Sequence, residues 1–206
     1  MEKIDIIKSI SERTGGDIYL GVVGAVRTGK STFIKKFIEN LVVPNIEDEY
    51  ERKRCLDEIP QTAQGKTIMT IEPKFVPSTA AKIKVEEFET NIKLVDCVGY
   101  VIPAAKGYED EMGEPRMVKT PWYDEDIPFV EAAEIGTEKV IRDHSTIGIV
   151  VTTDGSIGDI TRNNYVEAEN EVISELKEIG KPFIVLLNSA HPTLPETERL
   201  AEKLKE

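Results

Sequence analysis

Two glycines five residues apart, followed by a lysine and a serine, are the residues in this chain whose spacing points most directly to chemistry. The stretch GAVRTGKS, residues 24–31, fits G-x-x-x-x-G-K-[ST], with an apolar run before it and an amphipathic run after it. Glycines let the backbone curl so that N–H groups face phosphate oxygens, and the following helix directs its positive dipole end at them. The lysine reaches the outer phosphates and the serine hydroxyl ligates Mg²⁺. The stretch therefore predicts a nucleotide-binding loop.

A second anchor for the metal is expected at Asp96. The segment IKLVDCVGY places this carboxylate at the end of an apolar strand, with Gly99 three residues further on. A carboxylate beside a phosphate loop holds the Mg²⁺ shell, and a glycine offers an unhindered backbone N–H to the terminal phosphate. The D-x-x-G spacing after a hairpin is typical of the GTPase-related class of P-loop proteins.

That class also closes its metal site with a threonine from the loop before the hairpin. The segment GKTIMTIEPKF offers Thr67 and Thr70, and Thr70 is the first candidate because of its spacing from the hairpin strand. Its hydroxyl would ligate Mg²⁺. Thr67 stays open as the alternative.

The chain departs from GTPases at two places. Where the guanine-reading motif N-K-x-D belongs, it has Asn188-Ser189-Ala190-His191, without the carboxylate that accepts the donors of guanine. Asn188 remains a candidate nucleotide contact, but selectivity for GTP should be lost. Tyr100 stands where a water-orienting glutamine is expected, so hydrolysis needs another group. Arg27, or a residue of a neighbouring subunit, is a candidate.

The elements that position these residues alternate between strands and helices. Strands are expected at 17–23, 82–88, 91–99, 145–153 and 182–188, and helices after the loop and at 47–58, 131–143, 165–179 and 196–205. This order predicts an α/β fold with helices on both faces of a mostly parallel sheet that contains one antiparallel hairpin strand. Residues 59–77 are expected to be an exposed loop, and residues 100–130 a long irregular insertion.

Composition limits the classes of function. The chain has 206 residues and a net charge of −12, which argues against non-specific nucleic-acid binding. Two cysteines are too few for a disulfide framework, and no apolar run is long enough to cross a membrane. The N-terminal residues predict an amphipathic helix with Ile4, Ile7 and Ile10 on one face. We expect one cytoplasmic domain over residues 1–206, a fragment of a longer protein.

The motifs GVVGAVRTGKSTF, GKTIMTIEPKF and LVDCVGY, together with KGYEDE, TPWYDEDIPF and TTDGSIGDI, closely resemble those of the stage IV sporulation protein A family. The resemblance covers essentially the whole chain. It implies a GTPase-derived domain of the TRAFAC-like class that hydrolyses ATP with Mg²⁺. The residues implied as catalytic are Lys30, Thr70 and Asp96, and those implied for the metal are Ser31, Thr70 and Asp96. Those implied for the nucleotide are Gly24, Ala25, Val26, Arg27, Thr28, Gly29, Lys30, Ser31, Thr32 and Gly99.

The resemblance also implies how the activity is used. Hydrolysis would drive self-assembly into a homopolymer, a basement layer for the spore coat on the outer forespore membrane, facing the mother-cell cytosol. A small membrane-bound partner peptide and other coat proteins would bind regions absent here, without direct membrane insertion. Two other functions stay open: a GTPase switch, which NSAH argues against, and a small-molecule kinase, whose substrate the acidic insertion would repel.

Overall fold

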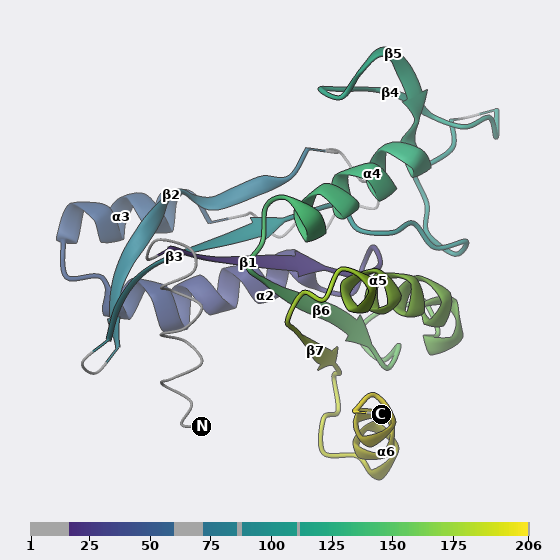
Figure 1. Ribbon diagram of the computed structural model, residues 1–206. Coiled ribbons are helices and arrows are strands. Elements are labelled where there is room, and N and C mark those ends of the chain that lie inside the picture. Colours follow the sequence, from purple (N-terminus) through teal and green to yellow (C-terminus); the bar gives the residue numbers. More distant parts are fainter. Residues whose placement is uncertain (1–16, 60–71, 86–87, 111, 206) are drawn as a thin grey trace.

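A five-stranded sheet forms the centre of the molecule (Figure 1). The computed structural model describes residues 17–59, 72–85, 88–110 and 112–205. The strand order is β2-β3-β1-β6-β7. Strands β1, β3, β6 and β7 are parallel, and β2 pairs antiparallel with β3. The strands are β1 (Asp17–Val23), β2 (Lys74–Val85), β3 (Phe88–Asp96), β6 (Ile147–Thr153) and β7 (Phe183–Asn188).

Helices cover both faces of this sheet, as the sequence predicts. One face packs against α2 and α3 through residues such as Ile34, Ile38 and Cys55, and the other packs against α4 and α5 through Val140 and Val172. The helices are α2 (Lys30–Phe37), α3 (Glu49–Asp57), α4 (Phe129–Arg142), α5 (Val166–Glu178) and α6 (Pro195–Lys203). A π-helical turn (Ile38–Val42) and a 3-10 turn (Val43–Asn45) extend α2, and another 3-10 turn (Arg162–Asn164) precedes α5.

Strand β2 begins earlier than the sequence predicts. It starts at Lys74, inside the segment that was expected to be an exposed loop, and runs to Val85. Its register with β3 shifts between Val76 and Ala81, so the alternation of buried and exposed side chains is interrupted there. The first half of the strand therefore lacks the regular alternation by which a strand is predicted from its sequence.

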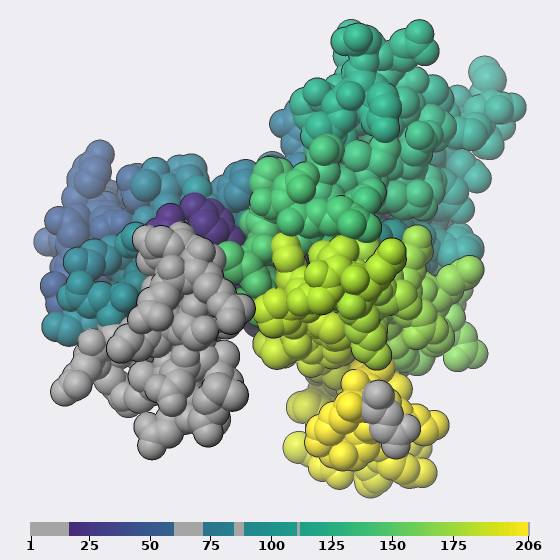
Figure 2. Space-filling view, viewed as in Figure 1, coloured from purple at the N-terminus to yellow at the C-terminus, as the bar shows by residue number. Residues whose placement is uncertain are grey.

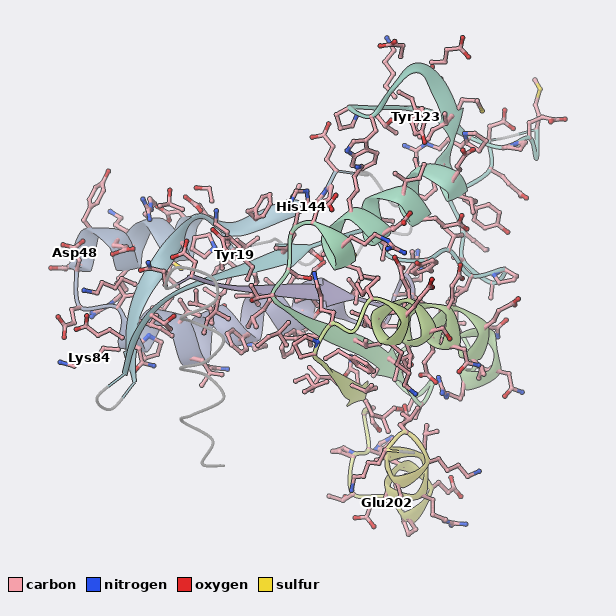
Figure 3. All side chains as sticks on the ribbon, viewed as in Figure 1. Tyr19, Asp48, Lys84, Tyr123, His144 and Glu202 are labelled. Atoms are coloured by element: carbon pink, nitrogen blue, oxygen red, sulfur yellow. The ribbon has the colours of Figure 1, made fainter. Side chains whose placement is uncertain are left out.

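The segment expected to be irregular contains a second small sheet. Strands β4 (Met117–Thr120) and β5 (Tyr123–Pro128) form an antiparallel hairpin whose residues are mostly exposed. The hairpin stands beside α4 and projects from the body of the molecule, as the space-filling view also shows (Figures 1 and 2). In Figure 3, Tyr123 marks this projection, and Glu202 of α6 marks the opposite end of the view.

One edge of the main sheet pairs with no further strand in the part of the chain that the structure describes. Strand β7 forms this edge; none of its side chains is fully buried, and Ile184 is 52% exposed. By contrast, β6 beside it is buried from Gly148 to Thr153. In the part of the chain that the structure describes, no helix has the length and apolar character needed to cross a bilayer.

Candidate functional site

The predicted phosphate loop lies between the carboxyl end of β1 and the first residue of α2, as the sequence requires. It bends at Gly24 and Gly29, which have φ angles of 132° and 95°. At Gly29 a Cβ atom would lie 2.4 Å from the Asn188 amide nitrogen, so a side chain fits there neither by conformation nor by space. A backbone curled in this way before a helix N-terminus is suited to bind an anion such as a phosphate group.

Lys30 is buried inside the loop, with a 5% exposed surface. Its ammonium group donates hydrogen bonds to the carbonyl oxygens of Gly24 and Ala25, at 3.2 Å and 2.7 Å. Burial lowers the pKa of Lys30, and the nearby Cys97 and Asp96 side chains oppose that shift. A buried cation whose hydrogen bonds go to neutral carbonyls is favourably placed to bind an anion.

Asp96 ends β3 beside this lysine and faces α2. Its Oδ2 accepts a hydrogen bond from the Ser31 hydroxyl at 2.8 Å, whereas its buried Oδ1 has no hydrogen-bond partner. Burial raises the pKa of Asp96, and the charge of Lys30, the Ser31 hydrogen bond and the charge of Lys74 oppose the shift.

These two side chains fit a magnesium ion bound together with a phosphate. An unsatisfied carboxylate oxygen beside a serine hydroxyl is the oxygen-rich arrangement that Mg²⁺ prefers, and Mg²⁺ takes its remaining ligands from phosphate and water. Among the described residues, no group of three or more His, Cys, Asp or Glu side chains could hold a metal by itself.

Gly99, three residues beyond the end of β3, lies against the loop. Its φ angle is 89°, and a Cβ atom there would lie 2.0 Å from the Gly24 carbonyl oxygen and 2.4 Å from the Lys30 nitrogen. The next residue, Tyr100, donates its N–H to the Gly24 carbonyl, and the Val26 N–H donates to the Tyr100 carbonyl. The backbone after Asp96 is thus joined to the loop by two hydrogen bonds.

The Tyr100 side chain is buried and bonded to α5. It is 6% exposed, and its hydroxyl donates to the Glu175 carboxylate on α5 at 2.9 Å. Burial raises the pKa of Tyr100, and the hydrogen bond to Glu175 raises it further. The position where GTPases carry a water-orienting glutamine therefore holds a side chain that is engaged elsewhere.

Asn188, at the end of β7, contacts the same loop. Its amide nitrogen donates to the Thr28 carbonyl oxygen at 3.0 Å, and the Thr28 hydroxyl donates to the Ala25 carbonyl at 2.9 Å. Both bonds brace the loop. The structure thus brings the Asn188 side chain into contact with the backbone of the phosphate loop.

Asp154, which follows β6, was not among the residues predicted from the sequence. Its carboxylate accepts hydrogen bonds from the hydroxyls of Ser156, Ser189 and Thr197, and so joins the loop after β6, the loop after β7 and the first turn of α6. Burial raises the pKa of this carboxyl, but the hydrogen bonds outweigh it and bring the pKa to about 2. The signal that indicated Asp96, an aspartate at the carboxyl end of an apolar strand, is also present in IVVTTDG.

The other predicted site residues differ in how they are placed. Ser31 and Thr32 lie in the first turn of α2, where Thr32 is exposed, and Arg27 is exposed in the middle of the loop. Thr67, Thr70 and the predicted N-terminal helix lie outside the described residues. Their assignment therefore stays a prediction.

The chain is similar to known proteins over its whole length. The family model described as "Stage IV sporulation protein A, ATPase domain" matches residues 1–206. Proteins named stage IV sporulation protein A are 67% identical in Bacillus subtilis (strain 168) and 66% identical in Bacillus anthracis, each over 100% of this chain and 42% of the relative. The relative in Clostridioides difficile (strain 630) is 56% identical over 98% of this chain and 41% of its own length. The chain thus spans about two fifths of these relatives.

Among solved structures, two variants of SsGBP match 98% of this chain with 18% sequence identity. The matches cover 48% and 49% of those chains, with TM-scores of 0.45 and 0.44. A likeness at this level supports no argument about function.

Proposed function

Because the chain belongs to the family of stage IV sporulation protein A ATPase domains, we propose that it binds ATP and hydrolyses it to ADP and phosphate with the help of Mg²⁺. The observation that carries the proposal is the convergence of Lys30, Ser31 and Asp96 at one end of the sheet. The loop's N–H groups and Lys30 would bind the phosphates.

Mg²⁺, when bound, neutralises charge on the outer phosphates and fixes their orientation. The Ser31 hydroxyl would ligate it directly, and the free Oδ1 of Asp96 would hold it through a water. The Gly99 N–H would donate to the terminal phosphate. The position requires glycine, since a Cβ atom there would collide with Lys30. The chain would thereby hold the reacting phosphate in a fixed place.

We propose that the protein does not select guanine over adenine, because the residues that follow Asn188 offer no carboxylate to the base. Residues Ser189 to His191 contain no carboxylate, and the nearby Asp154 already accepts three hydroxyl groups. Guanine presents two donors that would stay unpaired, which is costly in a closed site. We expect ATP to be hydrolysed at least as well as GTP. A competition assay in which GTP is preferred a hundredfold would contradict the ATPase proposal and favour the GTPase switch.

The third possibility, a small-molecule kinase, has less support. The insertion carries one arginine, Arg116, whose guanidinium lies over the Phe129 ring and donates to the Gly107 carbonyl. A kinase lid needs arginines that turn toward a phosphorylated substrate. Release of phosphate from ATP without an added acceptor distinguishes hydrolysis from transfer.

We further propose that hydrolysis drives self-assembly into a basement layer for the spore coat on the outer forespore membrane, facing the mother-cell cytosol. The family membership supports this proposal. A membrane-bound partner peptide and other coat proteins would bind outside this chain. We expect protein of the relatives' full length to sediment as polymer after ATP hydrolysis. Equal sedimentation with a non-hydrolysable ATP analogue would contradict the coupling.

Thr70 is expected to separate binding from hydrolysis. A hydroxyl that ligates the metal contributes most when charge spreads over the phosphoryl oxygens in the transition state, so its loss lowers turnover more than affinity. We expect Thr70→Ala to bind ATP within about threefold of the unmodified protein and to hydrolyse it about 10–100-fold more slowly. Affinity and turnover are measured on one preparation. If Thr67→Ala loses turnover instead, the sensor lies three residues earlier.

A further inference from the structure

Arg27 differs from every other residue of the phosphate loop in its exposure. Within residues 24–30 the other side chains and glycines are buried or half-buried, with Val26 at 2% and Thr28 at 1%, whereas Arg27 is exposed. A long cationic side chain is thus presented on the outer surface of the loop that would wrap the phosphates.

Its backbone conformation is also unusual. Arg27 has a φ angle of 63°, and in the described part of the chain no other residue except glycine has a positive φ. L-residues avoid this region because Cβ approaches the following carbonyl oxygen. Such conformations persist where the surrounding structure enforces them, and they cluster at functional sites.

The neighbours of Arg27 enforce this conformation. On one side, the Val26 N–H donates to the Tyr100 carbonyl at 2.8 Å. On the other side, the Thr28 hydroxyl and the Thr28 carbonyl are bound by Ala25 and Asn188. The loop is therefore fixed on both sides of the arginine, and a glycine would adopt the same backbone more easily.

The charge of Arg27 acts on Tyr165, the residue just before α5. Burial raises the pKa of Tyr165, and the positive charge of Arg27 opposes that shift, which places the charge close to the phenol. Tyr165 is 2% exposed and ends the turn that precedes α5. A change in the side-chain rotamers of Arg27 would carry the guanidinium from this position across the mouth of the loop.

Hydrolysis creates a need for positive charge at this mouth. A water oxygen forms a bond to the terminal phosphorus while the bond to the bridging oxygen breaks; one of the water's protons stays on the released phosphate and the other passes to solvent. Negative charge builds on the bridging and terminal oxygens. Lys30 approaches from inside the loop, and Tyr100 is bonded to Glu175, so the outer side needs its own cation.

We propose that Arg27 is a catalytic residue of the ATP hydrolysis proposed above. Its guanidinium binds the outer side of the phosphates and neutralises the charge that develops on their oxygens as water attacks. The left-handed (αL) backbone conformation of Arg27 fixes the position of its Cα and Cβ atoms. The arginine acts on the nucleotide bound by its own chain. The inference rests on the proposed ATPase function and assigns the group that stabilises the developing charge on the outer side of the phosphates.

The test measures ATP affinity and turnover for Arg27→Ala, Arg27→Lys and Arg27→Gly. We expect Arg27→Ala to bind ATP within about threefold of the unmodified chain and to hydrolyse it about 10–100-fold more slowly, as for the loss of one electrostatic donor. Arg27→Lys should keep part of the turnover. Arg27→Gly should raise the thermal unfolding midpoint because it removes the αL strain, and should still lose turnover.

The combination of higher stability and lower turnover in Arg27→Gly is not expected of a residue that only supports the loop. Arg199→Ala, on α6, is the matched control and should behave as the unmodified chain. Lys74 lies opposite Asp96 in the β2–β3 register. Lys74→Gln therefore tests whether Lys74, instead of Arg27, supplies the positive charge needed for hydrolysis.

The outcomes separate the inference from the proposed function. If the unmodified chain hydrolyses no ATP, the proposed function fails and the inference fails with it. If it hydrolyses ATP and the Arg27 variants turn over normally, only the inference is overturned. Loss of turnover in Lys74→Gln but not in Arg27→Ala would overturn it as well.

Discussion

Replacing Lys30 with alanine is expected to weaken ATP binding at least tenfold, about 1.4 kcal/mol, and to abolish measurable hydrolysis. Lys30 is buried in the loop and donates only to the Gly24 and Ala25 carbonyls, so its charge is available to the outer phosphates. No other cation of the described loop is buried there. Calorimetric titration with ATP measures the loss.

Two variants control for side effects of this change. Lys30→Met removes the charge but keeps much of the buried volume, so a cavity alone cannot explain a shared loss of binding. Lys36→Ala removes an exposed lysine from the same helix, with a 64% exposed side chain, and should bind ATP normally. Unchanged affinity in both Lys30 variants would count decisively against the site.

The second large effect is expected at Asp96. Asp96→Asn keeps the shape of the side chain and a hydrogen-bond acceptor for Ser31. It removes the negative charge of the carboxylate, whose Oδ1 has no hydrogen-bond partner. We expect ATP binding in the presence of Mg²⁺ to weaken about tenfold or more, and binding in excess chelator to change much less. The difference between the two titrations reports the metal contribution.

Asp124→Asn, on the exposed strand β5, is the matched control and should leave both titrations unchanged. An equal loss for Asp96→Asn with and without Mg²⁺ would show that the carboxylate supports the fold of the loop. In that case the metal would have to be held by other groups.

The sequence predicted which residues lie together at the candidate site better than it predicted the elements around them. The loop, Lys30 and Asp96 were identified because each motif requires a particular residue type at a particular end of a strand or helix, and the structure places all three together. The contact of Asn188 with the Thr28 carbonyl is long-range, and a single sequence carries no information on it beyond the motif position.

Each feature that was missed has its own physical reason. The hairpin β4–β5 is short and mostly exposed, so neither strand alternates between apolar and polar residues in the way that periodicity detects. The first half of β2 was hidden because the register shifts after Val76. Asp154 was overlooked because, unlike Asp96, it belongs to no nucleotide-binding motif that the sequence matched, and its contacts with Ser189 and Thr197 are visible only in the structure.

The open edge of the sheet has a consequence for how this chain behaves in concentrated solution. Strand β7 reads FIVLLN, carries no charge and offers a row of backbone donors and acceptors that no described strand pairs. Such an edge templates the addition of strands from other molecules and lowers colloidal stability. The chain can therefore aggregate by a route that needs no nucleotide. A charge introduced at Ile184, 52% exposed on this strand, would close that route and leave turbidity and light scattering to report only nucleotide-dependent assembly.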